Sequence, residues 1–361
     1  MKGNDSRFVK SVAGSIENDE VEKMKPLLQV DDLHVTFQTH AGKIKAVRGV
    51  SFAIHEGETL GIVGESGSGK SVTAKALMKL LPSLQVKYER GAIWFRGANL
   101  LEMNEREMQA IRGKEISMIF QDPMTSFNPT KKVGSQIIEG MKKHEKIESK
   151  IARKRALRML EFVGIPHPEE RIDQYPHEYS GGMRQRAMIA MALACDPKLV
   201  IADEPTTALD VTIQAQILER MKVMQDKLGT AILFITHDLG VVAEMCDRVA
   251  VMYAGKIVEI GPVQQLFAHP QHPYTQGLLM SIPRVQTKKH NALIPIVGSP
   301  PDLYALPQGC AFYPRCRFAM RICKQLDPKL HEIRSSQFSA CWLNHPLSKK
   351  QVLKEAKHVD R

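Results

Sequence analysis

The feature that most constrains this chain is a glycine-rich segment placed between an apolar run and an amphipathic one. Leu60–Val63 (LGIV) has the composition of a buried strand, and Gly64–Ser71 (GESGSGKS) follows at once. Ser71–Leu81 then has the apolar spacing of a helix, which Pro82 stops. The segment fits G-x-x-x-x-G-K-[ST] in the strand–loop–helix context that this motif requires. The sequence therefore predicts a phosphate-binding loop.

The chemistry of this loop follows from its residue types. Glycines let the backbone curl so that N–H groups point at phosphate oxygens, and the helix N-terminus adds a positive dipole. Lys70 is expected to reach the β- and γ-phosphates and Ser71 to ligate Mg²⁺. The residues predicted to bind nucleotide here are Gly64, Ser66, Gly67, Ser68, Gly69, Lys70, Ser71 and Val72.

A second motif is an apolar strand that ends in two carboxylates. Leu199–Asp203 (LVIAD) reads as a buried strand, and Glu204 follows it. Asp203 at the strand end is expected to hold Mg²⁺ through water, and Glu204 to polarise the attacking water as general base. Such a strand is weak evidence alone and strong evidence beside a phosphate loop.

A third motif is a pair of glycines that open a helix. Ser180, Gly181 and Gly182 expose backbone N–H groups beside a hydroxyl, which makes a second phosphate-binding surface. Because the chain has one nucleotide loop, this surface is expected to serve the nucleotide of another subunit.

The remaining pattern indicates an α/β fold. Strand-like runs alternate with helical ones up to Gly261, which favours a parallel sheet covered on both faces. Residues 133–164 are helical in pattern and basic, and we interpret them as a surface helix. Hydrophobic residues make up 43% of the chain and charged residues 25%, which excludes general disorder. No uncharged apolar run approaches the ~18 residues that a membrane span needs.

With these motifs in place, the chain resembles the ATP-binding subunits of ABC transporters over roughly residues 27–261. Ser180–Gly182 matches the family signature, although Met183 stands where the family usually has Gln. The resemblance implies ATP hydrolysis by a P-loop NTPase core, which closes as a sandwich of two ATPases. It also implies roles for further residues: Gln121 at Mg²⁺ and the attacking water, Asp210 at the dimer seam, His237 at the γ-phosphate, and Phe37 stacked on adenine.

A narrower resemblance points to importers of oligopeptides, dipeptides or nickel. Residues 120–129 (FQDPMTSFNP), 270–275 (PQHPYT) and 298–303 (GSPPDL) look like that branch, closest to its D-type ATPase. This implies a heterodimer with an F-type ATPase, two membrane permeases, an extracellular peptide-binding protein, and a peripheral place on the cytoplasmic face of the membrane. Nucleic acid is not an expected partner. The alternatives are a nickel importer, or a soluble ABC-type ATPase that acts on nucleic acid or ribosomes, a class compatible with the net charge of +11.

The implied organisation has three parts. Residues 1–26 form an N-terminal tail, 27–261 the nucleotide-binding domain with a helical subdomain at about 125–190, and 262–361 a proline-rich C-terminal extension. We call residues 262–361 the extension throughout.

The extension contains a group of four cysteines. Their spacing misses the ~2–4-residue gaps usual for structural zinc, whereas a [4Fe–4S] cluster tolerates varied spacing and accompanies importers of this branch. A cluster is expected here, zinc or unligated thiols being the alternatives, with the charge of nearby Arg315, Arg317, Arg321 and Lys324 offsetting it. The predicted ligands are Cys310, Cys316, Cys323 and Cys341.

Overall fold

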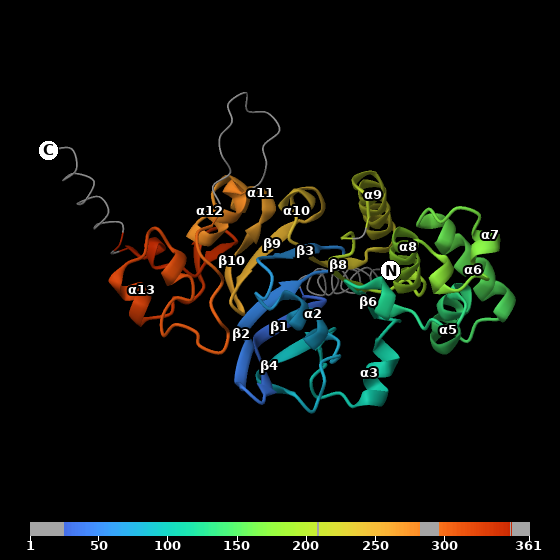
Figure 1. Ribbon diagram of the computed structural model, residues 1–361, viewed down its shortest axis with the longest axis horizontal. Coiled ribbons are helices and arrows are strands. Elements are labelled where there is room, and N and C mark those ends of the chain that lie inside the picture. Colours follow the sequence, from blue (N-terminus) through green and yellow to red (C-terminus); the bar gives the residue numbers. More distant parts are fainter. Residues whose placement is uncertain (1–24, 208, 282–295, 347, 349–361) are drawn as a thin grey trace, which may run out of the picture.

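A computed structural model describes residues 25–207, 209–281, 296–346 and 348. Nearly all of the predicted tail 1–26 lies outside these residues, as does Ala208 beside the predicted seam residue Asp210. The described chain is elongated, with helices gathered at one end and the extension at the other (Figure 1).

A parallel sheet forms the centre of the molecule. Four of its strands consist entirely of buried residues, as the continuous apolar runs predict. These are β3 (Thr59–Val63), β6 (Ile116–Ile119), β7 (Leu199–Asp203) and β8 (Ala231–Ile235). In the described residues the whole sheet has eight strands, in the order β11-β12-β10-β9-β3-β8-β7-β6. The parallel strands are β3 (Thr59–Val63), β6 (Ile116–Ile119), β7 (Leu199–Asp203), β8 (Ala231–Ile235) and β9 (Arg248–Tyr253).

A separate antiparallel sheet packs beside it in the order β2-β1-β4-β5. Its apolar residues share one core cluster with β3 and α2. The members are β1 (Leu28–Thr39), β2 (Gly42–Ile54), β4 (Val86–Phe95) and β5 (Ala98–Asn99).

Helices cover the sheets and build the helical subdomain. The predicted helix 71–81 is shorter in the structure, because Lys79 adopts a left-handed backbone angle. The predicted stretch 133–164 is two helices, because Lys146 also takes that conformation. The helices are α2 (Lys70–Leu77), α3 (Glu105–Ile111), α4 (Pro123–Ser126), α5 (Val133–Glu145), α6 (Ser149–Phe162), α7 (Pro168–Arg171), α8 (Gly181–Leu193), α9 (Val211–Leu228), α10 (Leu239–Met245), α11 (Val263–Ala268), α12 (Pro273–Met280) and α13 (Arg321–Gln325).

The extension continues the central sheet. β10 (Lys256–Pro262) pairs antiparallel with β9 on one side and with β12 (Gln337–Ser339) on the other. β11 (His331–Arg334) completes the edge. Tyr274 and Phe312 pack into the same core cluster as the helical subdomain. The extension therefore shares its core with the rest of the chain.

The prediction of an iron–sulfur cluster at Cys310, Cys316, Cys323 and Cys341 was wrong. Within the described residues, no group of three or more His, Cys, Asp or Glu side chains is arranged to hold a metal ion. The four thiols are free and border a cavity of about 10 Å³, which is room for roughly one water molecule. Burial raises the pKa of Cys310 to about 11 and that of Cys341 to about 12.

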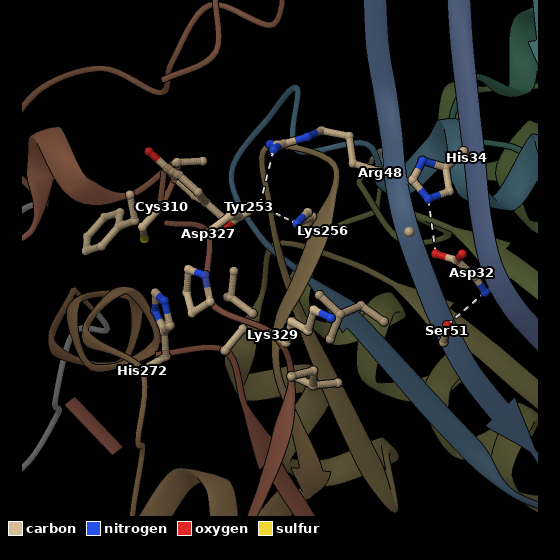
Figure 2. Close-up of a pocket in the computed structure, with 18 of the residues that line it drawn as sticks. Asp32, His34, Arg48, Ser51, Tyr253, Lys256, His272, Cys310, Asp327 and Lys329 are labelled. Carbon is tan, nitrogen blue, oxygen red and sulfur yellow. Dashed lines mark hydrogen bonds and ion pairs between the residues drawn. The ribbon is translucent and has the colours of Figure 1, made fainter. Parts of the chain in front are cut away.

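The physical reason is that the extension has other means of attachment. Besides sheet pairing, Phe312 packs edge-on against Tyr253 with 5.2 Å between ring centroids. Asp327 forms an ion pair with Lys256 (Figure 2). Its carboxylate oxygen Oδ2 also lies 3.6 Å from Arg48 Nη2. The proline-rich sequence gives little sign of these contacts, because their partners lie far away in the chain.

Candidate nucleotide-binding and catalytic site

Four parallel strands deliver the predicted functional residues to one edge of the sheet. The loop 64–71 follows β3, Gln121 follows β6, Asp203 ends β7, and His237 comes just after β8. Because parallel strands point the same way, their carboxyl ends meet at a common edge, where α/β sheets bind ligands.

The glycines of the loop are required by its shape. Gly64, Gly67 and Gly69 have φ angles of 154°, 76° and 102°, a region that favours glycine. A Cβ on Gly64 would lie 2.2 Å from the Met252 carbonyl oxygen. The loop therefore curls tightly against β9 before α2 begins.

Lys70 turns back over this loop. Its Nζ donates to the carbonyl oxygens of Gly64 (2.7 Å) and Glu65 (3.0 Å), and the residue is only 6% exposed. Burial lowers the pKa of Lys70, and the carboxylates of Glu204, Asp203 and Glu65 oppose that shift. Among the described residues, the buried Oγ of Ser68 has no hydrogen-bond partner, so a hydroxyl of this loop is available to a phosphate.

Ser71 and Asp203 lie side by side. The Ser71 hydroxyl donates to Asp203 Oδ1 at 3.0 Å, and Asp203 is 1% exposed. The pKa of Asp203 is raised, because the effect of burial exceeds the opposing effect of the hydrogen bond from Ser71. A hydroxyl and a carboxylate are the hard oxygen donors that Mg²⁺ prefers, so this pair fits the ion when phosphates supply the remaining oxygens.

Glu204 is at the centre of the three predicted catalytic residues. Its carboxylate accepts a hydrogen bond from Gln121 Nε2 (3.1 Å) and lies 3.4 Å from His237 Nδ1. Its backbone has a φ of 50°, unusual for a non-glycine residue, and its N–H donates to Ile235 O. Backbone strain of this kind clusters at active sites.

Beside the loop lies a cavity of about 560 Å³. Phe37, Ser71 and Val72 are among the residues that line it. Phe37 is half-buried at the end of β1. The cavity thus continues the phosphate loop towards an aromatic ring, as an adenine-stacking role requires.

The second phosphate-binding surface remains apart from the first. Ser180 is the exposed N-cap of α8, and its Oγ accepts from Met183 N at 3.3 Å; in the described chain it makes no hydrogen bond to the loop 64–71. Gly181 and Gly182 begin the same helix. Asp210 caps α9 by accepting from Ile213 N. These four residues are not brought to the site of Lys70.

Sequence reasoning missed Glu65 of the loop and the two residues that contact it. Glu65 N donates to the hydroxyl of Tyr274 (2.8 Å), and the Glu65 carboxylate pairs with Arg315. These partners are 209 and 250 residues away in sequence, so no local pattern could pair them with the loop. Arg315 was expected near the cysteines as a counter-charge for a cluster.

Two family models match the chain. One, described as "ABC transporter", covers residues 47–207, and the other, "Oligopeptide/dipeptide transporter, C-terminal region", covers residues 258–323. Among the described residues, no helix is both long enough and apolar enough to cross a membrane.

Curated relatives agree over most of the chain. The "Oligopeptide transport ATP-binding protein OppD" of Bacillus subtilis is 58% identical over 320 residues, which is 89% of each chain. The "Dipeptide transport ATP-binding protein DppD" of the same organism is 54% identical, over 91% of this chain and 98% of the relative. Among solved structures, the dimeric ATP-binding cassette MJ0796 bound to ADP and Pi matches with a TM-score of 0.60 at 25% identity, over 65% of this chain and 98% of that one.

Proposed function

This chain belongs to the ATP-binding subunits of ABC transporters, in the oligopeptide and dipeptide branch, and from that premise we propose the role of each residue in its site. The chain is an ATP-hydrolysing subunit that powers peptide import. The observation that carries the residue assignment is the meeting of Lys70, Ser71, Asp203, Gln121 and Glu204 at one sheet edge.

ATP binding uses the loop and the cavity beside it. Lys70 and backbone N–H groups of the loop, other than that of Glu65, hold the phosphates, and the ring of Phe37 stacks on adenine. Ser71, Asp203 and Gln121 would hold Mg²⁺, which supplies neutralisation of the phosphate charge.

Hydrolysis uses the residues around Glu204. The Glu204 carboxylate accepts a proton from water as the water oxygen bonds to the γ-phosphorus. The bond from that phosphorus to the bridging oxygen breaks, which leaves ADP and inorganic phosphate. Gln121 holds the carboxylate in place through its hydrogen bond. His237, whose Nδ1 lies 3.4 Å from the Glu204 carboxylate, contacts the γ-phosphate.

A second subunit completes the site. Peptide importers of this kind work with permeases and a substrate-binding protein. We assign the partner ATPase to the F-type, so that Ser180–Gly182 of this chain covers the partner's nucleotide at the dimer seam near Asp210. The exposed position of Ser180 and the dimeric state of the solved cassette support this arrangement. The assembly places the chain on the cytoplasmic face of the membrane, with residues 27–261 as its nucleotide-binding domain, a helical subdomain at about 125–190, and residues 262–361 as its extension.

Removal of the Lys70 ammonium tests the binding site. Lys70→Ala in the full chain should weaken ATP binding about 10- to 100-fold, since a hydrogen bond to a charged group contributes about 1.5–3 kcal/mol. Displacement of a fluorescent ATP analogue measures this. Lys222→Ala, which removes an exposed lysine on α9, is the matched control and should bind as the parent chain does. Unchanged ATP affinity in Lys70→Ala would refute the assignment.

A further inference from the structure

Every polar group of Glu65 is engaged. Its N–H donates to the Tyr274 hydroxyl at 2.8 Å, and its carbonyl oxygen accepts from Lys70 Nζ at 3.0 Å. Its carboxylate takes two parallel hydrogen bonds from Arg315, at 2.6 and 2.9 Å. Glu65 lies inside the phosphate loop, whereas Tyr274 and Arg315 belong to the extension. The extension therefore contacts the phosphate loop through Glu65.

Arg315 is built into this position. Its side chain is 5% exposed, and its Nε also donates to Val297 O at 3.1 Å. The guanidinium carbon lies about 6 Å from the ring centroids of Tyr253 and Phe312, within cation–π range. The planar guanidinium matches the two carboxylate oxygens of Glu65, a fit that lysine lacks.

The extension also contacts the body of the central sheet. Asp327, also in the extension, pairs with Lys256 and lies close to Arg48 of β2 (Figure 2). Tyr253, labelled in the same view, ends β9 and accepts a hydrogen bond from Arg315 at 3.3 Å. The extension is thus held on the body of the sheet and reaches the loop through Arg315 and Tyr274.

We propose that Arg315 and Tyr274 are positioning residues for ATP: they fix Glu65, and through its carbonyl oxygen they fix Lys70. The inference rests on the proposed phosphate-binding role of the loop 64–71. Coupling between two sites is reciprocal, so bound ATP also stabilises the extension against unfolding.

The test is the ATP affinity of the full chain in four variants. Arg315→Gln should weaken binding about tenfold, within the range of about 5- to 150-fold typical of coupled sites. Arg315→Lys keeps the positive charge but cannot donate two parallel hydrogen bonds. Its ATP affinity should lie between those of the parent chain and Arg315→Gln. Tyr274→Phe keeps the buried ring and removes only the acceptor of the Glu65 N–H, so it should weaken binding about threefold. Arg317→Gln is the matched control, because Arg317 is exposed and stacks on Phe318, and it should bind ATP normally.

A double-mutant cycle separates positioning from general stability. If Arg315 acts through Glu65, then Glu65→Gln with Arg315→Gln should bind ATP no more weakly than the poorer single variant. In the assembled transporter, Arg315→Gln should raise the KM for ATP and change kcat little. Additive losses, or normal ATP affinity in a folded Arg315→Gln chain, would overturn the proposal.

Two further measurements keep the result unambiguous. If Arg315→Gln does not fold, Tyr274→Phe decides, and normal ATP affinity in that variant overturns the proposal. Lys70→Ala distinguishes this inference from the proposed function. If Lys70→Ala loses ATP and Arg315→Gln does not, only the positioning role fails, whereas normal binding in Lys70→Ala removes the site on which both rest.

Discussion

At the scale of single residues, the site depends on how Glu204 is held. Gln121 donates to one carboxylate oxygen, and His237 approaches the other. The Glu204 side chain is 15% exposed, so water can reach it. Neighbouring Asp203 is almost fully buried and bonded to Ser71, which suits a fixed role at Mg²⁺. The two adjacent carboxylates therefore differ in environment, which fits the proposed roles of Glu204 as general base and Asp203 as Mg²⁺ ligand.

A substitution that keeps the shape of Glu204 but removes its carboxylate tests its role as general base. Glu204→Gln should lower ATP turnover by a factor of about 10² or more, because an amide cannot accept the proton of the attacking water. ATP binding should survive, and the closed complex should accumulate. Turnover and nucleotide occupancy of the assembled transporter measure this, with exposed Glu219→Gln as the control. Near-normal hydrolysis in Glu204→Gln would exclude the general-base role.

Residue identities were predictable where a local pattern encodes them. Lys70, Ser71 and Asp203 lie in short motifs whose geometry follows from strand, turn and helix, and the structure brings them together. Glu65 was passed over because its importance comes from Arg315, 250 residues away. The cysteines were misread because spacing alone does not show how the surrounding chain packs.

At the scale of elements, the sequence predicts strands and helices well where the apolar pattern is continuous. β7 has the predicted bounds 199–203. The stretch 133–164 was predicted as one unit, because a left-handed residue at Lys146 leaves no mark in apolar spacing. β11 and β12 were not predicted, since their stability comes from pairing with β10.

α12 of the extension begins at a buried histidine. His272 is 2% exposed, and its Nδ1 accepts from Tyr274 N at 3.1 Å, which requires the neutral ring. Burial lowers the pKa of His272 from 6.5 to about 3. Between these values the unfolded chain binds a proton that the folded chain does not. The free energy of unfolding therefore falls as pH drops through this window.

A cap without a titratable ring isolates this effect. His272→Asn keeps an N-cap acceptor and removes the proton uptake. Between pH 6.5 and 5, the parent chain should lose about 2 kcal/mol more of its unfolding free energy than the variant, at about 1.4 kcal/mol per unit. Urea unfolding at both pH values measures it. Buried Glu259, which accepts from His272 N, is common to both chains and cancels. Parallel pH profiles for the two chains would show that His272 does not titrate in this way.

At the scale of the whole molecule, the proposed composite site uses two separate places on the chain. The phosphate loop lies at the sheet edge, while α8 begins at an exposed N-terminus in the helical subdomain (Figure 1). Val211, the first residue of α9 beside Asp210, is 84% exposed. An exposed apolar side chain and an exposed helix N-terminus fit a seam with a second ATPase. The fold class was predictable from the chain, whereas the proposed partner ATPase lies outside it.

The substitution Gly182→Asp in the assembled transporter tests the proposed composite site. The new carboxylate would face the γ-phosphate on the partner ATPase and repel it. Gly140→Asp, which places the same group in open space on α5, is the control. Photoreactive ATP, with the labelled chains then separated, reports on each site. We predict normal labelling of the Gly182→Asp chain, reduced trapping of ATP on the partner, and lost turnover. Loss of labelling on the Gly182→Asp chain itself, with the partner unaffected, would contradict it.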